Sequence, residues 1–330
     1  MARKKPDLDY LLAQARRISE HRELGAEREI RKVFKQLSKD LNAYIADVHA
    51  RFAAEDGTLR YADLQKAGYA ARFLEEIEQR ISVCTPKVAK ELETLVDETY
   101  RLAYESMIQG VTEQGIEGLD EIFAESLVIT PEQIKNVVRN PLMEIALQKN
   151  HRDIVYDIKQ AVAVGLMNGD RYSTIAKKIN VALDKENGPY KNAIRIARTE
   201  VHRVREAGNH DAAVYVDEEL QKGTTGFRMV KIWKTMKDER VRPQYVRKRK
   251  KGGWVRGIAK GGADHVKMEG QTVLEIEPFD LGDYKGQHVE AMMPGSSGVA
   301  AHDIHCRCYA SRKMMTDEEY FAKTGKHFPK

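Results

Sequence analysis

Two cysteines and two histidines stand close together near the end of the chain, in the segment AHDIHCRC at residues 301–308. Thiolates and imidazoles are common ligands of Zn²⁺. In a β-strand, Cys306 and Cys308 would point to the same face, ~6–7 Å apart, and both sulfurs could approach one ion. The segment is therefore a candidate metal site, and we expect a strand over Asp303–Tyr309 to position it.

Three histidines could complete such a site: His265, His302 and His305. His305 adjoins Cys306 and would face the opposite side of a regular strand, so His265 or His302 is the better candidate. The Cys-x-Cys spacing differs from the C-x2-C spacing of common zinc sites, and the sequence has no second cysteine pair. We therefore favour two reduced cysteines that fasten the last strand into the core. Zinc and a redox disulfide are the alternatives.

The remaining cysteine, Cys84, is expected to be an inert small hydrophobic residue. A total of 3 cysteines argues against a secreted disulfide framework and indicates a reducing compartment. No apolar run approaches the ~20 residues of a membrane span, and no signal-peptide pattern follows the first residues. We expect a protein that is made in the cytosol and has no membrane span.

A second set of possible metal ligands is His202, Glu206 and His210, which lie within and just after a helix predicted over Lys191–Gly208. The two histidines would lie ~80° apart around the helix and ~12 Å apart along it, which is too far to share one ion. We therefore predict that this face is charged and solvated. It carries Arg198, His202, Arg205 and Glu206, whereas the buried face carries Ile194, Ala197, Val201 and Val204.

A strongly basic segment, Arg240–Lys260, holds nine Lys or Arg residues and no Asp or Glu. It is predicted to be a loop or a hairpin with Gly252 and Gly253 at its turn. Clustered cations beside aromatic residues are typical of segments that bind a phosphate backbone. Docking on an acidic protein surface, or a charged loop without function, are the alternatives. The residues assigned to nucleic-acid contact are Arg240, Arg242, Arg247, Lys248, Arg249, Lys250, Lys251, Trp254 and Arg256.

Helices are expected to dominate the first two thirds of the chain. A heptad-like apolar stripe predicts a long helix over about Ala26–Ala54 that needs a helical partner, and the stretches Thr58–Ser82 and Pro86–Gln109 supply candidates within the chain. Thr130-Pro131-Glu132-Gln133 has the pattern of a capping box at the start of a helix. The stripe consists of Ile30, Phe34, Leu37, Leu41, Tyr44 and Val48.

Strands follow the helices. Phe227–Trp233 alternates in the manner of a strand, with Val230 and Ile232 on one face. Gln271–Ile276 and Asp303–Tyr309 are further candidates. Because helices precede strands rather than alternating with them, the expected fold class is α+β, with a long helical N-terminal region and a small, mostly antiparallel sheet.

Six short features follow one another between about Ile154 and Arg312. A helix carries Ala197-Arg198-Thr199-Glu200, a strand carries Trp233, and an Asp-x-Arg-x-Arg stretch starts at Asp238. His265 with Gly270, then Pro294-Gly295, then Cys306-Arg307-Cys308 complete the order. This order resembles the phage Mu protein F-like family of head morphogenesis proteins. The motif residues to which we assign structural roles are Arg198, Thr199, Glu200, Trp233, Asp238, His265, Pro294, Cys306 and Cys308.

The resemblance implies a minor component of a phage head that is associated with the portal vertex and takes part in head assembly or genome delivery. The implied partners are the portal protein, a scaffold or major capsid protein, and double-stranded DNA. The implied location is the head interior at the portal vertex, after assembly in the host cytoplasm. Two features depart from the family pattern: His305 stands where Asn is usual, and Pro243–Asp264 has the character of an insertion.

We expect four parts: a helical contact region for portal or scaffold at 1–125, a helical lead-in at 126–215, an α+β part at 216–312 with the basic insertion at 243–264, and a tail at 313–330. The favoured function involves no turnover, no catalytic residues and no cofactor other than a possible zinc. The alternative is a metal-dependent or nucleotide-handling enzyme acting on nucleic acid, with acid–base candidates Glu200, His202, His265 and Asp238. A free DNA-binding protein is a third possibility, although no helix-turn-helix or zinc-finger spacing is evident.

Overall fold

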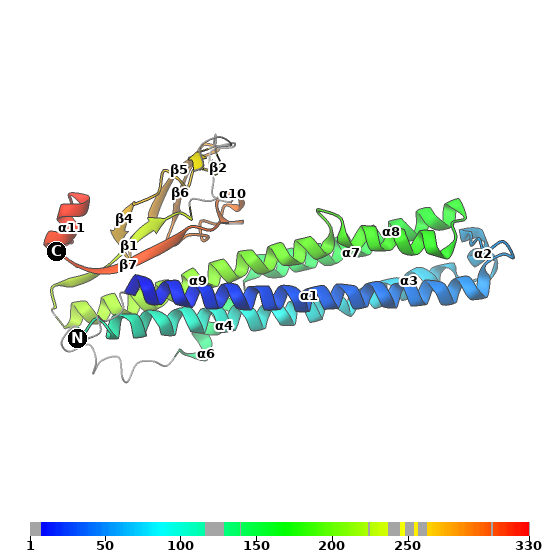
Figure 1. Cartoon of the computed structure of the whole chain (residues 1–330), viewed down its shortest axis with the longest axis horizontal. Helices are drawn as coiled ribbons and strands as arrows, with labels where there is room; N and C mark the ends of the chain where they lie inside the picture. The colour runs from blue at the N-terminus through cyan, green and yellow to red at the C-terminus, as the bar shows by residue number, and fades with distance from the viewer. Residues whose placement is uncertain are drawn as a thin grey trace. The chain divides into compact units, whose positions relative to one another are not determined.

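The computed structural model describes residues 8–115, 129–138, 140–223, 225–236, 245–247, 254–256, 263–304 and 306–329, with backbone only at 245–247 and 254–256. The chain forms two compact units, each built from separate stretches of sequence. Unit 1 comprises Met1–His21, Val96–Val138 and Arg198–Lys330, and unit 2 comprises Arg22–Leu95 and Arg139–Ala197. Long helices and a small antiparallel sheet give the predicted α+β class (Figure 1).

Three long helices contribute residues to both units: α1 (Leu8–Phe52), α4 (Cys84–Thr112) and α9 (Pro189–Lys222). The other helices each belong to one unit. Unit 2 contains α2 (Tyr61–Lys66), α3 (Ala70–Ser82), α7 (Pro141–Asn168) and α8 (Tyr172–Asp184), and unit 1 contains α6 (Pro131–Val138), α10 (Ala300–Asp303) and α11 (Asp317–Thr324).

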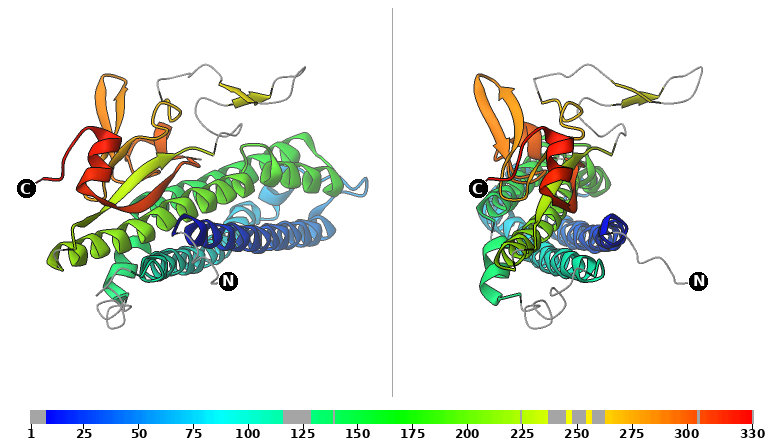
Figure 2. Two further views of the ribbon diagram at one scale, coloured as in Figure 1. Left: turned by 60° about the vertical axis from the view of Figure 1, so that its left-hand side comes forward. Right: turned by 90° about the vertical axis from the view of Figure 1, so that its left-hand side faces the viewer.

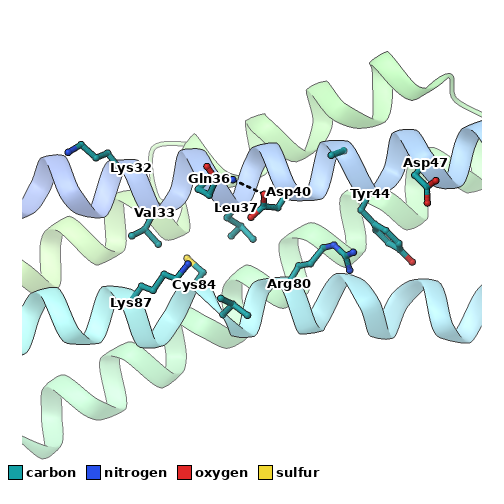
Figure 3. A pocket seen from close by; sticks show the side chains of 12 residues that line it. Lys32, Val33, Gln36, Leu37, Asp40, Tyr44, Asp47, Arg80, Cys84 and Lys87 are labelled. Atoms are coloured by element: carbon teal, nitrogen blue, oxygen red, sulfur yellow. Dashed lines mark hydrogen bonds between the residues drawn. The ribbon is translucent and has the colours of Figure 1, made fainter.

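The apolar stripe predicted on α1 is buried in unit 2, where no member is more than 7% exposed. Its partners come from the same chain, as expected: the rings of Tyr44 and Phe73 on α3 stack with centroids 5.6 Å apart. Cys84 at the start of α4 is also buried, and burial raises the pKa of its thiol to about 12. An unreactive thiol of this kind agrees with the predicted role as a small core residue. Figure 3 shows this part of unit 2, where Leu37, Tyr44 and Cys84 line a pocket.

Local sequence signals fix several helix ends. The capping box is confirmed, because the backbone N–H of Gln133 donates to the Thr130 hydroxyl while the Gln133 side chain accepts from the Thr130 N–H. The Asn140 side chain caps α7, which begins with Pro141. Gly169 ends α7 in the left-handed conformation, with a φ of 66°. Glycine pays no steric penalty there.

The helix α9 is longer than predicted, running from Pro189 to Lys222 instead of Lys191–Gly208. Its predicted apolar face is buried. The prediction that the opposite face is solvated is wrong for three of its members: His202 is 6% exposed, Arg205 8% and Glu206 1%. The reason is tertiary, because side chains and loops of the C-terminal strands in unit 1 cover this face of α9.

The main sheet has three antiparallel strands in the order β4-β1-β7. They are β1 (Phe227–Lys234), β4 (Thr272–Leu274) and β7 (Tyr309–Thr316). The predicted alternation along β1 is confirmed: Val230 and Ile232 pack with Leu274 on one face, and Trp233 packs with Phe279 on the other. Two hairpins complete the strands, β2 (Tyr245–Arg247) with β3 (Trp254–Arg256), and β5 (Phe279–Tyr284) with β6 (Gln287–Ala291). The pairing of β2 with β3 agrees with the hairpin predicted for the basic segment.

The predicted strand Asp303–Tyr309 is wrong. Residues Ala300–Asp303 form the short helix α10, and β7 begins only at Tyr309. Asp303 stabilises the turn, because its carboxylate accepts from the backbone N–H and the hydroxyl of Ser297, and its carbonyl accepts from the N–H of Cys306. The segment after β7 contains the helix α11, which the sequence did not predict and which packs beside β7 and β4 (Figure 2).

Candidate metal centre

The candidate centre lies in unit 1, at the end of β1 where Trp233 stands. The segment that carries His265 is tied to this strand: Gly270 N–H donates to the Trp233 carbonyl, and Trp233 N–H donates to the Gln271 carbonyl, both at 2.9 Å. The edge of the His265 ring meets Trp233, with centroids 5.6 Å apart. Gly270 adopts a φ of 86° where the segment after His265 meets β1 again. This explains why the sequence motif combines His265 with Gly270.

Three potential ligand atoms converge beside Trp233. Nδ1 of His265 lies 3.6 Å from Sγ of Cys306 and 3.4 Å from Sγ of Cys308. All three ligand atoms lie within 4.8 Å of one another, and all three residues are buried. The two cysteines face one core although they precede β7 rather than belong to a strand. Both are free thiols, so the structure has no disulfide between them.

His302 on α10 supports His265 from the far side. Its Nδ1 lies 3.1 Å from Nε2 of His265, and the two rings stack with centroids 5.2 Å apart. His302 is itself only 1% exposed. The structure therefore separates the two histidines that the sequence left as alternatives: His265 faces the sulfurs, and His302 contacts His265.

A further histidine, His202 of α9, reaches the same place. Its ring packs so closely against Gly295 that a Cβ there would lie 2.9 Å from its Cδ2 atom. The Nδ1 atom of His202 lies 2.9 Å from Nη2 of Arg205. The sequence did not place His202 here, because the prediction put it on a solvated helix face. The requirement for glycine after Pro294 is the one signal in the sequence that bears on this contact.

The two thiols are electrostatically unequal. The pKa of Cys306 is lowered well below its usual value, chiefly by a hydrogen bond from Cys308, with further contributions from His202 and His265. Burial raises the pKa of Cys308, and the neighbouring Cys306 adds to this rise. The two shifts therefore run in opposite directions, because hydrogen bonding favours the thiolate of Cys306 and burial disfavours that of Cys308.

A network of buried charges joins α9 to the sheet below the cysteines. Glu275 follows β4, is 0% exposed, and accepts hydrogen bonds from Arg312 of β7 at 3.2 Å. His210 of α9 contacts the same carboxylate at 2.7 Å. Glu206 lies 3.8 Å from Arg312 and accepts from the backbone N–H of Ala310. These contacts explain why His210 and Glu206 share a helix face without sharing a metal.

A second buried pair fixes the start of β1. Asp217 of α9 is 0% exposed and accepts from Arg228 at 2.8 Å and from the backbone N–H of Met229 at 2.6 Å. Sequence reasoning missed Asp217, Glu275 and Arg312, because single charged residues in a sequence carry no sign of burial. The bidentate contact between Asp217 and Arg228 holds the end of α9 against the sheet.

The other predicted site residues fall in two groups. Among the enzyme candidates, Glu200 is buried and accepts from Arg203 at 2.8 Å, whereas Asp238 lies outside the described residues. Of the nucleic-acid residues, Arg247, Trp254 and Arg256 are described in their backbone alone. The rest lie outside the described residues, namely Arg240, Arg242, Lys248, Arg249, Lys250 and Lys251; so does His305.

The fold and the site together define a protein with an α+β unit that holds a buried Cys–His cluster beside the end of β1. Residues 156–311, which contain the cluster and all of its supporting residues, match the family described as Phage Mu protein F like protein. This is the family that the motif order predicted.

Two curated proteins show the extent of the similarity. The chain is 25% identical over 287 residues to Minor head protein GP7 of Bacillus phage SPP1, covering 86% of this chain and 80% of that protein. It is 25% identical over 185 residues to NAD(+)--arginine ADP-ribosyltransferase EFV of Enterococcus faecalis (strain ATCC 700802 / V583), covering 55% of this chain. This chain spans only 31% of that transferase. No solved structure matches the chain.

Proposed function

We propose that this protein is a phage minor head protein that acts in head morphogenesis by binding other head components, without turnover. The observation that carries the proposal is the similarity to the SPP1 minor head protein, which extends over 80% of that protein and so includes the helical region as well as the family domain. The similarity to the transferase covers less than a third of that protein, which gives no basis for transferring its activity.

The contacts of the acid–base candidates favour this structural role. Glu200 is held by Arg203, His202 by Arg205, and His265 by His302 and the two thiols. Each of these three groups thus has protein partners that position it within the fold. Assembled heads, purified and analysed by mass spectrometry, should contain the protein in few copies, and heads from a phage with the gene deleted should be defective or absent. Wild-type heads that lack the protein would contradict the proposal.

The proposed role includes association with the portal vertex, and α7 of unit 2 offers a surface for it. Five large apolar side chains on this helix are at least 43% exposed: Leu142, Ile145, Tyr156, Val164 and Met167. At ~100° per residue they fall within one sector of about 100° on the helix. Exposed apolar side chains gathered on one face mark interaction sites more often than scattered ones do.

The test is co-purification of the portal protein with the full chain. A variant with Leu142, Tyr156 and Met167 changed to Gln should lose portal binding while keeping its circular dichroism spectrum. The matched control changes Ile276 and Phe321 to Gln, since these are exposed apolar residues of unit 1. Deletion of the N-terminal helices is a poor test, because Asp9 of α1 accepts a hydrogen bond from Ser311 of β7 in unit 1. Undiminished binding by the α7 variant would exclude this surface.

Contact with packaged DNA rests on the basic segment that joins β2 to β3. Changing Arg247, Lys248, Arg249, Lys250 and Lys251 to Gln should weaken DNA binding. The salt dependence should also flatten, by ~0.9 log units per log salt for each phosphate that the variant no longer neutralises. The matched control removes equal charge from five exposed helical lysines, Lys35, Lys39, Lys66, Lys87 and Lys90. If both variants bind DNA equally, net charge alone accounts for the binding and the segment has no special part.

None of the helices among the described residues has the length and apolar character needed to cross a membrane. The proposed place of action is the head interior at the portal vertex, reached from the host cytoplasm during assembly. The proposed partners are the portal protein, a scaffold or major capsid protein, and double-stranded DNA.

A further inference from the structure

We propose that His265, Cys306 and Cys308 bind a zinc ion, with His302 holding the ring of His265. This site is independent of the role in the phage head. It would fasten the segment before β7 to the end of β1 through one ion.

The spacing of the ligand atoms fits a tetrahedral ion. With Zn–S bonds of ~2.3 Å and a Zn–N bond of ~2.0–2.1 Å, a sulfur and a nitrogen on the same tetrahedral ion lie ~3.6 Å apart. The distances from Nδ1 of His265 to the two sulfurs are 3.4 and 3.6 Å. The nitrogen and both sulfurs thus already stand at the N–S separations that zinc requires. Two thiolates with one imidazole also suit this borderline-soft ion.

The hydrogen bond between the stacked histidines sets the proton positions that zinc needs. Nε2 of His265 lies 3.1 Å from Nδ1 of His302. If Nε2 of His265 carries the proton and donates it to His302, then Nδ1 of His265 presents its lone pair to the space between the sulfurs. Ligating histidines commonly donate their other N–H in this way, and such partners orient the ring and raise its basicity. His302 is therefore a positioning residue and not a ligand.

The role of His202 follows from its contact with Arg205. A guanidinium only donates hydrogen bonds, so the Nδ1 atom of His202 accepts from Arg205 Nη2 at 2.9 Å. A ring with a single proton then carries it on Nε2, which is buried and has no hydrogen-bond partner among the described residues. With Nδ1 accepting from Arg205 and the proton on Nε2, His202 has no free lone pair for the ion. The fourth tetrahedral position is therefore left to water or another small ligand.

The charge balance also favours a cation. The cysteines and His265 border an apolar cluster that includes Trp233 and Phe279. A thiolate in such surroundings is costly without a paired positive charge. A divalent ion between the two sulfurs would supply that charge when both cysteines bind it as thiolates.

The test is the zinc content of the full chain, purified under reducing conditions without added chelator. We expect about one zinc per chain, and we expect Co²⁺ to replace it with the sulfur-to-metal charge-transfer absorption of a thiolate site. The Cys306→Ser/Cys308→Ser variant should lose both signals. The matched control is Cys84→Ser, which removes the other buried thiol and should keep the full metal content. His302→Ala should remain folded and bind zinc ~10–100-fold more weakly, as expected when a positioning partner is removed.

Wild-type protein that contains no zinc and takes up neither Zn²⁺ nor Co²⁺ would overturn the proposal, whether or not the variants fold. A Cys306–Cys308 disulfide recovered from freshly purified protein would overturn it as well. So would full zinc content in the double serine variant, because the ion would then be bound elsewhere.

Discussion

Glu275 is the residue whose replacement should most clearly reveal the buried charge network. Its carboxylate is 0% exposed, receives three hydrogen-bonding contacts of 3.2 Å from Arg312, and meets His210 at 2.7 Å. Burial by itself would raise the pKa of Glu275, but the positive charge of Arg312, with His210 and Lys231, outweighs burial and lowers it. The change Glu275→Gln keeps the shape of the side chain and removes its charge.

The expected destabilisation follows from what remains behind. Arg312 is also 0% exposed and cannot give up its proton. After the change, Glu206 at 3.8 Å is the carboxylate left beside it. Removing one partner of a buried ion pair costs ~3–5 kcal/mol when the other charge is left uncompensated, and at 3.8 Å Glu206 compensates Arg312 only in part. The double variant Glu275→Gln/Arg312→Met should therefore lose less free energy of unfolding than the two single changes added together. The apolar replacement removes the buried positive charge that Glu275→Gln alone leaves behind.

Urea unfolding followed by tryptophan fluorescence measures this change in the free energy of unfolding. The chain has 2 tryptophans, so a Trp254→Phe background leaves Trp233 of β1 as the sole probe of the sheet. The control is Glu290→Gln on β6, where the side chain is 55% exposed and the change should stay within ~0.5 kcal/mol. If Glu275→Gln were no more destabilising than this control, or if the double variant showed simple additivity, the reasoning from an uncompensated buried charge would be refuted.

Two further predictions use the same unfolding assay. Gly208→Ala should destabilise the protein by ~1–3 kcal/mol although alanine favours helices, because the new Cβ in α9 would lie 2.6 Å from the Tyr100 carbonyl oxygen. Gly25→Ala in α1 is the control: its new Cβ meets nothing within 4 Å, and the change should stabilise the protein by up to ~1 kcal/mol. Equal effects at the two glycines would contradict this. Burial lowers the pKa of Lys231 from 10.5 to about 8. The unfolded chain therefore binds more protons between these values, and raising the pH across them should stabilise the wild type by up to ~3 kcal/mol relative to Lys231→Met. Parallel pH profiles for the two proteins would disprove the assignment.

The sequence by itself determined the features that depend on near neighbours in the chain. The α1 stripe, the Thr130–Gln133 capping box, the Gly169 stop and the alternation along β1 are periodic or local patterns, and each specifies which face is apolar or where a helix ends. The order of the motifs also predicted the family that residues 156–311 match. These signals need no knowledge of which segments meet in space.

Only the tertiary structure decided which polar residues are buried and which histidine faces the cysteines. His202 and Glu206 lie on a helix face that is charged in the sequence, and they are buried because the sheet packs against that face. The cysteines stand before β7 rather than within it. The helix α10 ends at Asp303, and the pairing of β7 with β1 begins only at Tyr309, so Cys306 and Cys308 lie in the connection between them. The burial of a polar group depends on contacts between residues far apart in the chain, and the type and spacing of a single residue carry no record of those contacts.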